Sequence, residues 1–216
     1  MLFHDRREAG RDLARRLLER GEGVPPDPFV LALPRGGVPV GDEIARALGA
    51  PLDVLVARKI GAPYNPEVGV GALAGEGPPL YDERTLAMLD LTADKLSRQV
   101  ATERAELRRR EDLYRGGRPA PDVTGRTVLV VDDGLATGVT ARAALRAVRE
   151  MKPGRVVLAV PVGSPEAAHA LAADADEVLC PHQPQPFYAV GQWYEEFDQV
   201  GDDEVITILR GHADSR

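Results

Sequence analysis

The stretch from Val128 to Arg142, VLVVDDGLATGVTAR, constrains the fold of this chain more than any other. It begins with four consecutive apolar residues, which is the pattern of a parallel strand covered on both faces. The run ends at two adjacent carboxylates, Asp132 and Asp133, and a glycine-containing turn then leads into residues with helical spacing. This order of strand, turn and helix predicts an α/β protein whose ligand binds beyond the carboxyl end of the strand.

The turn after this strand has the groups that an anion requires. Amides at the start of a helix have no partner within the helix, and the hydroxyls of Thr137 and Thr140 add further donors. The glycines of the turn let the backbone approach a phosphate closely. Asp132 and Asp133 repel a phosphate, but they suit the hydroxyls of a sugar or the water shell of Mg²⁺. A phosphorylated sugar that carries a metal ion satisfies both halves of the segment.

Other stretches repeat the order of strand and helix that a parallel sheet needs. Residues 29–33 and 52–57 are short apolar runs, and we expect the second strand to end at Arg58 and Lys59. Further strands are expected at residues 155–160 and 177–180, and helices at residues 5–20, 38–48, 138–151 and 166–173. The prediction is a mostly parallel central sheet with helices on both faces.

The length of 216 residues suits a single domain spanning residues 1–216, with its core in residues 25–60 and 120–180. Residues 61–118 interrupt this core. They begin with a Gly- and Pro-rich stretch that predicts a mobile hairpin or hood, and they continue with a charged helical insertion at residues 81–116. The thin apolar stripe of this insertion favours packing on the core, with a dimer contact as the alternative. Residues 181–216 are rich in aromatic residues, which predicts either a packed cap or a surface that stacks on a planar base.

Composition argues against several kinds of partner and site. The net charge of −7 disfavours binding to nucleic acid, and no apolar run is long enough to span a bilayer. Cys180 is the only cysteine, so an internal disulfide is excluded and a reducing, cytoplasmic setting is expected. Cys180 and His182 lack further metal ligands nearby and are expected to be structural. Neither the Asp-x-Asp-Gly pattern of haloacid-dehalogenase phosphatases nor a P-loop is present, and Gly69-Val70-Gly71 does not open a convincing helix.

Taken as a whole, the segment from Val128 resembles the signature with which type I phosphoribosyltransferases bind 5-phosphoribosyl diphosphate (PRPP). Residues 33–37, LPRGG, match the diphosphate-binding loop, where members of the family often hold a cis peptide before a residue other than proline. Residues 57–61, ARKIG, resemble the Arg-Lys pair before the flexible catalytic loop in relatives that act on orotate or adenine. The resemblance implies that the ribose and its 5-phosphate contact Asp132, Asp133, Gly134, Leu135, Ala136, Thr137, Gly138, Val139 and Thr140. It implies that diphosphate contacts Arg35, Gly36, Gly37, Arg58 and Lys59.

The activity implied by this resemblance is transfer of a phosphoribosyl group between PRPP and a nitrogenous acceptor, a nucleobase or related compound. Asp133, Arg58 and Lys59 are the expected catalytic residues, and Mg²⁺ is the expected cofactor, held by Asp132 and Asp133 through water. The partners expected are small molecules, with no nucleic acid and no membrane, and a homodimer is left open. A regulatory protein of the same fold that binds PRPP or a nucleotide without chemistry is the alternative, followed by a hydrolase or phosphatase.

Overall fold

A five-stranded parallel sheet forms the centre of the chain in a computed structural model that describes residues 2–19 and 25–213. The strand order is β2-β1-β6-β7-β8, and every neighbouring pair is parallel. These strands are β1 (Pro28–Ala32), β2 (Leu52–Val54), β6 (Thr127–Val131), β7 (Arg155–Ala159) and β8 (Glu177–Leu179). The predicted α/β class and mostly parallel central sheet are confirmed.

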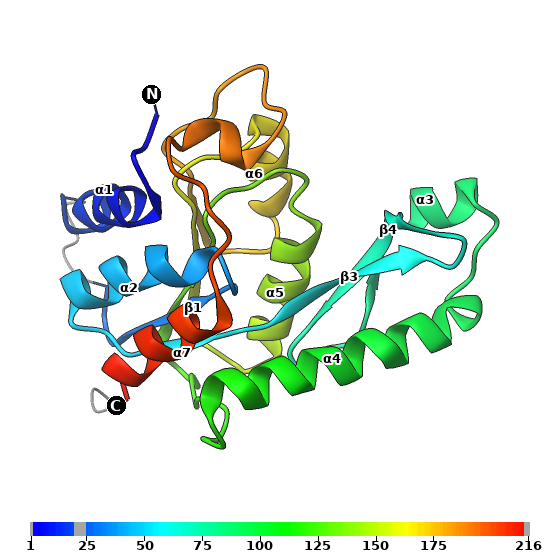
Figure 1. Cartoon of the computed structure of the whole chain (residues 1–216), viewed down its shortest axis with the longest axis horizontal. Coiled ribbons are helices and arrows are strands. Elements are labelled where there is room, and N and C mark those ends of the chain that lie inside the picture. Colours follow the sequence, from blue (N-terminus) through cyan, green and yellow to red (C-terminus); the bar gives the residue numbers. More distant parts are fainter. Residues whose placement is uncertain (1, 20–24, 214–216) are drawn as a thin grey trace.

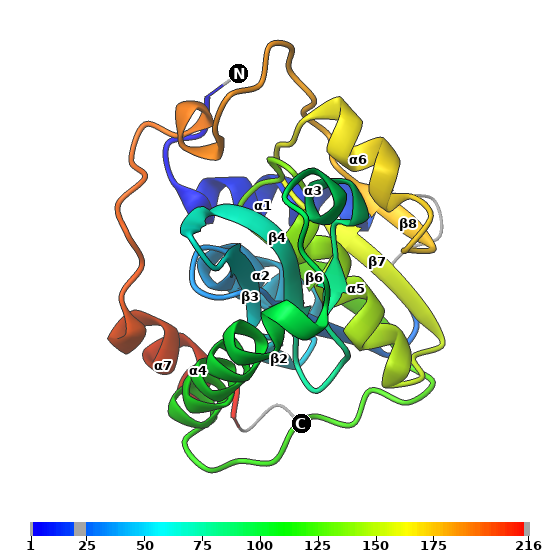
Figure 2. The same ribbon diagram turned by 90° about the vertical axis from the view of Figure 1, so that its right-hand side faces the viewer.

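Helices cover both faces of this sheet, as Figures 1 and 2 show. Alternate strand residues belong to two separate apolar clusters, because successive side chains of a strand point to opposite faces. Leu129 and Val131 pack with α1 (Arg6–Glu19), α2 (Gly37–Leu48) and α7 (Asp202–Gly211). Val128 and Val130 pack on the other side with α5 (Val139–Glu150) and α6 (Pro165–Leu171). Burial of all five residues of β6 therefore explains its unbroken apolar run.

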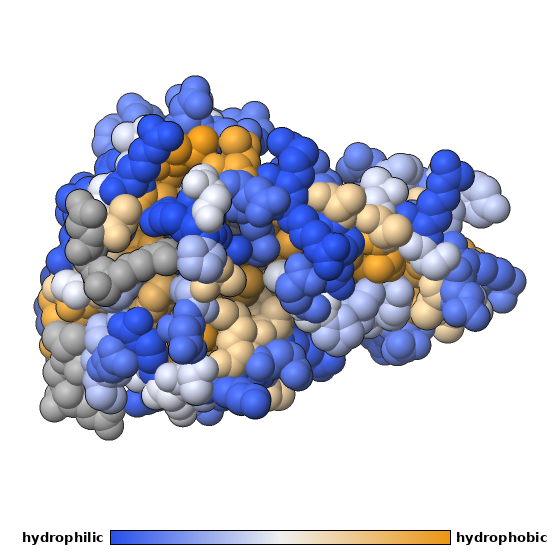
Figure 3. All heavy atoms as spheres, turned by 90° about the horizontal axis from the view of Figure 1, so that it is seen from below, coloured by the Kyte–Doolittle hydropathy of each residue, from blue (hydrophilic) through white to orange (hydrophobic). Residues whose placement is uncertain are grey.

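A second, antiparallel sheet projects from the core as an arm, defined here as residues 57–115 (Figures 1 and 3). It consists of β3 (Ala57–Ala62), β4 (Asn65–Ala74) and β5 (Leu80–Tyr81), followed by α3 (Glu83–Met88), the 3₁₀ turn η1 (Asp94–Leu96) and α4 (Ser97–Arg115). The apolar stripe of the insertion packs as predicted, since Leu96 and Leu107 are fully buried in the cluster that also holds Leu129. The predicted hairpin is the β3–β4 pair.

The predicted second strand is wrong at its carboxyl end. The core strand β2 stops at Val54, and β3 of the arm begins at Ala57. Between them the chain changes partner, because the Leu55 amide donates to the Ala32 carbonyl of β1 whereas the Val56 carbonyl accepts from Gly75, which follows β4. Both intervening residues are buried, so the apolar run continues through the break and hides it. Arg58 and Lys59 consequently lie inside the arm rather than at the edge of the core sheet.

The N-terminal segment meets residues near the end of the chain beside the carboxyl edge of the sheet (Figure 2). Phe3 forms an isolated bridge with Tyr194, and the Glu195 amide donates to the Phe3 carbonyl at 2.8 Å. Residues 187–198, called the aromatic cap below, include the short 3₁₀ turn η2 (Val190–Trp193). Sequence patterns left open whether this aromatic stretch is a packed cap or a surface that stacks on a planar base, and they missed α7, which follows it. Among residues 2–19 and 25–213, no helix combines the length and apolar character needed to cross a membrane.

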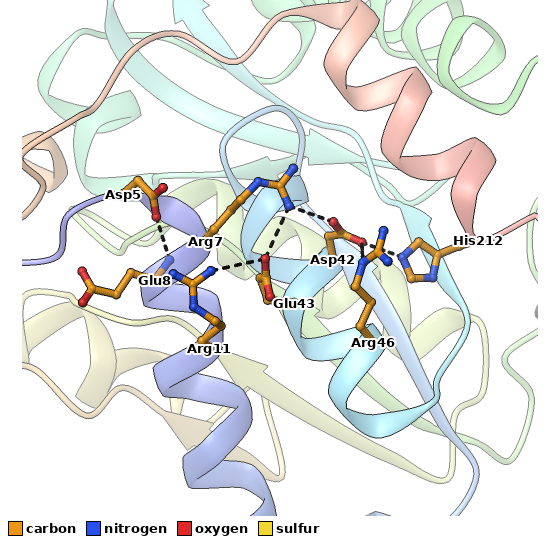
Figure 4. Close-up of polar contacts among 8 residues, drawn as sticks. All are labelled: Asp5, Arg7, Glu8, Arg11, Asp42, Glu43, Arg46 and His212. Atoms are coloured by element: carbon orange, nitrogen blue, oxygen red, sulfur yellow. Dashed lines mark hydrogen bonds and ion pairs between the residues drawn. The ribbon is translucent and has the colours of Figure 1, made fainter.

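A buried carboxylate joins three helices on the side of α1, α2 and α7 (Figure 4). The Asp42 side chain is 1% exposed and accepts hydrogen bonds from Arg46 Nε at 2.8 Å and Arg7 Nη1 at 3.0 Å. His212 Nε2 lies 2.7 Å from its Oδ1 atom. Burial acts to raise the pKa of Asp42, but the hydrogen bonds with His212, Arg46 and Arg7 outweigh it and lower the pKa to about 2.

Candidate functional site

Two loops predicted from separate parts of the sequence lie against each other at the carboxyl edge of the sheet. Asp132 and Asp133 follow β6, and the Asp133 amide donates to Asp132 Oδ1 at 2.9 Å. A Cβ atom added to Gly36 would overlap the Asp133 carboxylate, and one added to Gly37 would lie 2.6 Å from the Val131 carbonyl oxygen. The approach of the loop at residues 33–37 to the acid pair therefore requires glycine at both positions. The Pro34–Arg35 peptide bond is cis.

The turn at residues 134–138 presents the start of α5. Gly138 adopts φ +76°, the left-handed conformation, and α5 begins at the next residue. The turn is anchored by Leu135, whose amide donates to the Val162 carbonyl at 2.9 Å and whose carbonyl accepts from the Ser164 amide at 2.8 Å. Thr137 is exposed at its outer side. The first amides of α5 have no acceptor within the helix, so the turn offers donors to a ligand.

A cavity of about 1060 Å³ lies between this turn and the arm. Thr137, Thr140 and Arg142 line it from the turn and α5, and Lys59 and Arg84 line it from the arm. Lys59 Nζ donates to the Glu67 carbonyl at 3.1 Å at the rim of this cavity. The arm wall also carries three carboxylates, Glu67, Asp82 and Glu83. The cations of the lining, Lys59, Arg84, Arg142 and Arg146, outnumber them by one, and with the hydroxyls they suit an anionic ligand.

The structure does not bring together the three cations expected to bind diphosphate, Arg35, Arg58 and Lys59. Arg58 and Lys59 are successive residues of β3, so their side chains point to opposite faces. Arg58 binds Glu103 of α4 at 2.7 Å, away from the cavity that Lys59 lines. Arg35 lies 3.6 Å from Asp202 at the start of α7. The expectation that Arg58 and Lys59 act as a pair is therefore not supported by their placement.

Three residues that the sequence did not reveal contact Asp133 or the groups around it. Arg6 Nε donates to Asp133 Oδ2 at 2.8 Å, and the Tyr194 hydroxyl donates to the Asp133 carbonyl at 2.6 Å. The Phe197 ring lies against the Arg6 guanidinium. The aromatic composition of the tail was the only signal for two of them, and Arg6 belongs to no motif.

Burial controls the charge of this acid pair. It raises the pKa of Asp132 well above its ordinary value, and the neighbouring charge of Asp133 raises it further. Burial also raises the pKa of Asp133, although Arg6 opposes this shift. A carboxylate whose charged form is disfavoured gains by meeting a hydroxyl, a cation or a metal ion, so this pair has the electrostatics of a binding site.

Cys180 and His182 lie next to the anchored turn without the features of a reactive site. Burial raises the pKa of the Cys180 thiol to about 12, and a thiol that stays protonated is a poor nucleophile. His182 Nε2 lies 3.4 Å from Asp12 Oδ2 of α1. Both placements agree with the structural role expected for these residues.

A magnesium ion at this edge would need oxygen ligands from a substrate. Within the described parts of the chain, no three His, Cys, Asp or Glu side chains gather as a metal site. Proteins commonly hold Mg²⁺ through one or two carboxylates, several waters and substrate phosphates. Asp132 and Asp133 fit that mode of binding, and they do not suffice for a metal site built by protein side chains alone.

A family model and a curated relative match this chain over nearly its whole length, and a second relative matches about half of it. A family model described as "Phosphoribosyl transferase domain" matches residues 4–204. A Mycobacterium tuberculosis protein, provisionally named phosphoribosyl transferase Rv0571c, is 45% identical over 215 residues, covering 99% of this chain and 48% of that protein. The chain thus spans about half the length of this curated relative. The bifunctional protein PyrR of Chloroflexus aurantiacus is 34% identical over 131 residues, covering 55% of this chain and 67% of that protein.

A solved structure shares the fold. The crystal structure of TT1426 from Thermus thermophilus superposes with a TM-score of 0.83 at 46% sequence identity. The match covers 99% of this chain and 100% of that one. The arrangement of core and arm described above is therefore similar to one already observed in a crystal.

Proposed function

The chain belongs to the phosphoribosyltransferase family, and from this premise we propose that it transfers a phosphoribosyl group between PRPP and a nitrogenous acceptor, releasing diphosphate. The observation that carries the proposal is the meeting of the acid pair, the loop at Gly36 and Gly37, and the anchored turn before α5 at one edge of the sheet. The acceptor in this proposal is a nucleobase or a related compound.

In this proposal, residues Ala136 to Thr140 bind the 5-phosphate of PRPP. Amides at the start of α5 point toward the turn, and the positive end of the helix dipole favours an anion there. Thr137 and Thr140 line the cavity, so their hydroxyls can donate to the same phosphate. Gly134, Leu135 and Val139 shape the turn, and burial of Leu135 keeps it rigid.

Asp132 and Asp133 bind the ribose hydroxyls. Their raised pKa values mean that the charged form of each carboxyl group is disfavoured in the protein alone. Hydrogen-bond donors of a bound ligand therefore stabilise that charged form. Mg²⁺ held by these residues through water would neutralise charge that develops on the leaving diphosphate. Asp133 is also the residue that we assign to proton transfer with the acceptor.

The diphosphate lies against Gly36 and Gly37, with Arg35 and Lys59 as its cations. Arg35 must exchange its contact with Asp202 for the ligand, and a role for Arg58 requires it to leave Glu103. The bond from the anomeric carbon to diphosphate breaks with positive charge on the sugar and negative charge on the diphosphate. Donors that turn toward the diphosphate would stabilise this separation of charge, and closure of the loop at residues 61–79 over the site would exclude water.

The test of the proposal is diphosphate release from PRPP in the presence of Mg²⁺, with and without a panel of purine and pyrimidine bases. Release that depends on one acceptor supports a transferase. Release without any acceptor indicates a hydrolase. The proposal is rejected if the protein releases no diphosphate and if calorimetry detects no PRPP binding.

Replacement of Thr137 by Ala adds a residue-specific test. The side chain is exposed, so its loss leaves the fold intact, but it removes a hydrogen bond to a charged phosphate worth roughly 1.5–3 kcal/mol. We expect PRPP to bind about tenfold or more weakly, measured by calorimetry. Thr124→Ala, at an exposed position outside the cavity, is the matched control and should bind PRPP like the parent protein.

A second candidate is a regulator of the same fold that binds PRPP or a nucleotide without chemistry. It is favoured by one observation, that Arg35 and Arg58 each contact a carboxylate of the protein. Tight PRPP binding without diphosphate release for any acceptor would support it. A cytoplasmic location and a homodimer also remain predictions, to be checked by fractionation and by sedimentation.

A further inference from the structure

Arg6, in the first turn of α1, contacts two separate parts of the molecule, Asp133 and the aromatic cap, with one guanidinium. Its Nε donates to Asp133 Oδ2 at 2.8 Å, and its Nη1 donates to the Asp198 carbonyl at 2.8 Å. Its Cζ lies 3.9 Å from the centre of the Phe197 ring. Only 12% of the side chain is exposed. A planar guanidinium is suited to this position, because its edges donate while its flat face packs on a ring.

The aromatic cap is placed around the same aspartate. The Tyr194 hydroxyl donates to the Asp133 carbonyl at 2.6 Å. The Tyr194 ring stacks on the Phe197 ring, with 5.0 Å between the ring centres. Val190 occupies the space that a side chain at position 134 would need, so the cap packs directly on Gly134. The cap therefore contacts the acid pair and its turn in three ways: through the hydrogen bond of Tyr194, through the packing of Val190 on Gly134, and through Arg6.

The N-terminal segment adds a second attachment next to Arg6. The Phe3 amide donates to the Trp193 carbonyl at 2.9 Å, and the Glu196 amide donates to the His4 carbonyl at 2.8 Å. Figure 2 shows the N-terminal segment beside the cap. These bonds position the backbone of the cap, whereas Arg6 connects the cap to a side chain of the site.

We propose that Arg6 is a positioning residue: it orients the Asp133 carboxylate and holds the aromatic cap over it as one wall of the acceptor pocket. The second half of this inference rests on the proposed function. Because one guanidinium makes both contacts, removing it frees the carboxylate and loosens the cap together. The acceptor then meets a disordered wall, while the phosphate turn on the other side of Asp133 keeps its own anchors at Leu135.

The ligand-free protein offers a direct readout, because Trp193 is the only tryptophan and lies in the cap. In Arg6→Ala we expect the Trp193 emission to shift to longer wavelength and acrylamide quenching to increase about twofold or more. Arg6→Lys keeps a cation but loses the flat face and one edge, so it should fall between Arg6→Ala and the parent. Arg11→Ala, on the same helix with a 59% exposed side chain paired to Glu43, is the matched control and should be unchanged.

Kinetic measurements test the second half of the inference, that the cap forms one wall of the acceptor pocket. Arg6→Ala should raise the acceptor KM about tenfold or more and weaken PRPP binding less than this, because the ribose loses an oriented Asp133 whereas the 5-phosphate keeps the turn anchored at Leu135. A residue with only a structural role would lower the unfolding temperature and weaken both ligands alike, so this split distinguishes positioning from folding. Arg6→Lys should restore part of the acceptor KM.

The outcomes separate this inference from the proposed function. Unchanged Trp193 emission and quenching in Arg6→Ala overturn the positioning role, whatever the activity of the parent protein. Increased quenching, in a parent protein that transfers to no acceptor, supports the attachment of the cap by Arg6 and rejects the acceptor wall with the proposed function. Increased quenching with an unchanged acceptor KM rejects the acceptor wall alone.

Discussion

Asp42 and Asp133 are carboxylates that each contact an arginine of α1, but the Asp42 side chain is 1% exposed whereas that of Asp133 is 15% exposed. Asp42 has three partners from three segments, Arg7, Arg46 and His212, and its pKa falls to about 2 (Figure 4). Asp133 lies beside a second carboxylate, Asp132, with Arg6 as the cation that contacts it, and burial raises its pKa.

The comparison separates a structural carboxylate from a candidate site carboxylate. The hydrogen bonds of Asp42 join α1, α2 and the end of α7 and stabilise its charge within the folded protein. The acid pair at Asp132 and Asp133 retains unfavourable electrostatics, which a ligand with hydroxyls or a cation relieves. Sites of binding and catalysis often hold charged groups that have few stabilising partners in the protein, and this lowers the stability of the fold.

The strongest effect that tests this comparison is on turnover. Asp133→Asn should reduce the rate of diphosphate release about 10²–10³-fold, since losing one transition-state interaction costs roughly 3–4 kcal/mol. Its unfolding temperature should stay close to that of the parent, because removing a charge that its partly buried surroundings disfavour offsets the lost contact with Arg6. Diphosphate assays and scanning calorimetry measure the two quantities, and a normal rate would contradict the site assignment.

The converse effect is expected at Asp42. Asp42→Asn should lower the free energy of unfolding by roughly 2 kcal/mol, because it leaves Arg7, Arg46 and His212 without their anion. The loss stays below that of a fully buried pair, since the Arg7 and Arg46 side chains are 41% and 62% exposed. Urea unfolding measures it, and the folded variant should keep its rate of diphosphate release. Loss of activity without loss of stability would show that Asp42 is not the structural member of the two.

Acid titration probes the same contrast. The pKa of Asp42 is lower in the folded protein, about 2, than its ordinary value of 3.8. Its stabilisation is therefore fully present above pH 3.8 and is lost as the pH falls through about 2. We expect the stability difference between the parent protein and Asp42→Asn to shrink over this window. A constant difference in urea unfolding between about pH 5 and about pH 2 would contradict the assignment.

A weaker effect is expected at the edge of this network. His212→Gln keeps a polar group near Asp42 but alters the fit of a buried ring, so unfolding should become easier by about 1 kcal/mol. Thermal unfolding measures the change. Arg210→Gln, at an exposed position of α7, is the control and should leave the unfolding temperature unchanged.

Much of the core could be predicted because its signals are local. The unbroken apolar run of β6 follows from burial on both faces, and the turn before α5 follows from residues that are consecutive in the chain. The break between β2 and β3 could not be predicted, because Leu55 and Val56 are apolar on both sides of a change of partner. The opposite directions of Arg58 and Lys59 depend on that break.

Sequence patterns were enough to predict the α/β core and the position of the acid pair with its turn, whereas the glycine loop at Gly36 and Gly37 was identified through the resemblance to a family. Their spacing is set by the geometry of single strands and helix starts, which a short segment encodes. The three-dimensional structure was needed to show that Arg6 reaches Asp133 across 127 positions of sequence and that the aromatic cap packs on Gly134. Such contacts depend on where whole elements pack, and no local pattern of residues specifies which distant side chain arrives at a buried charge.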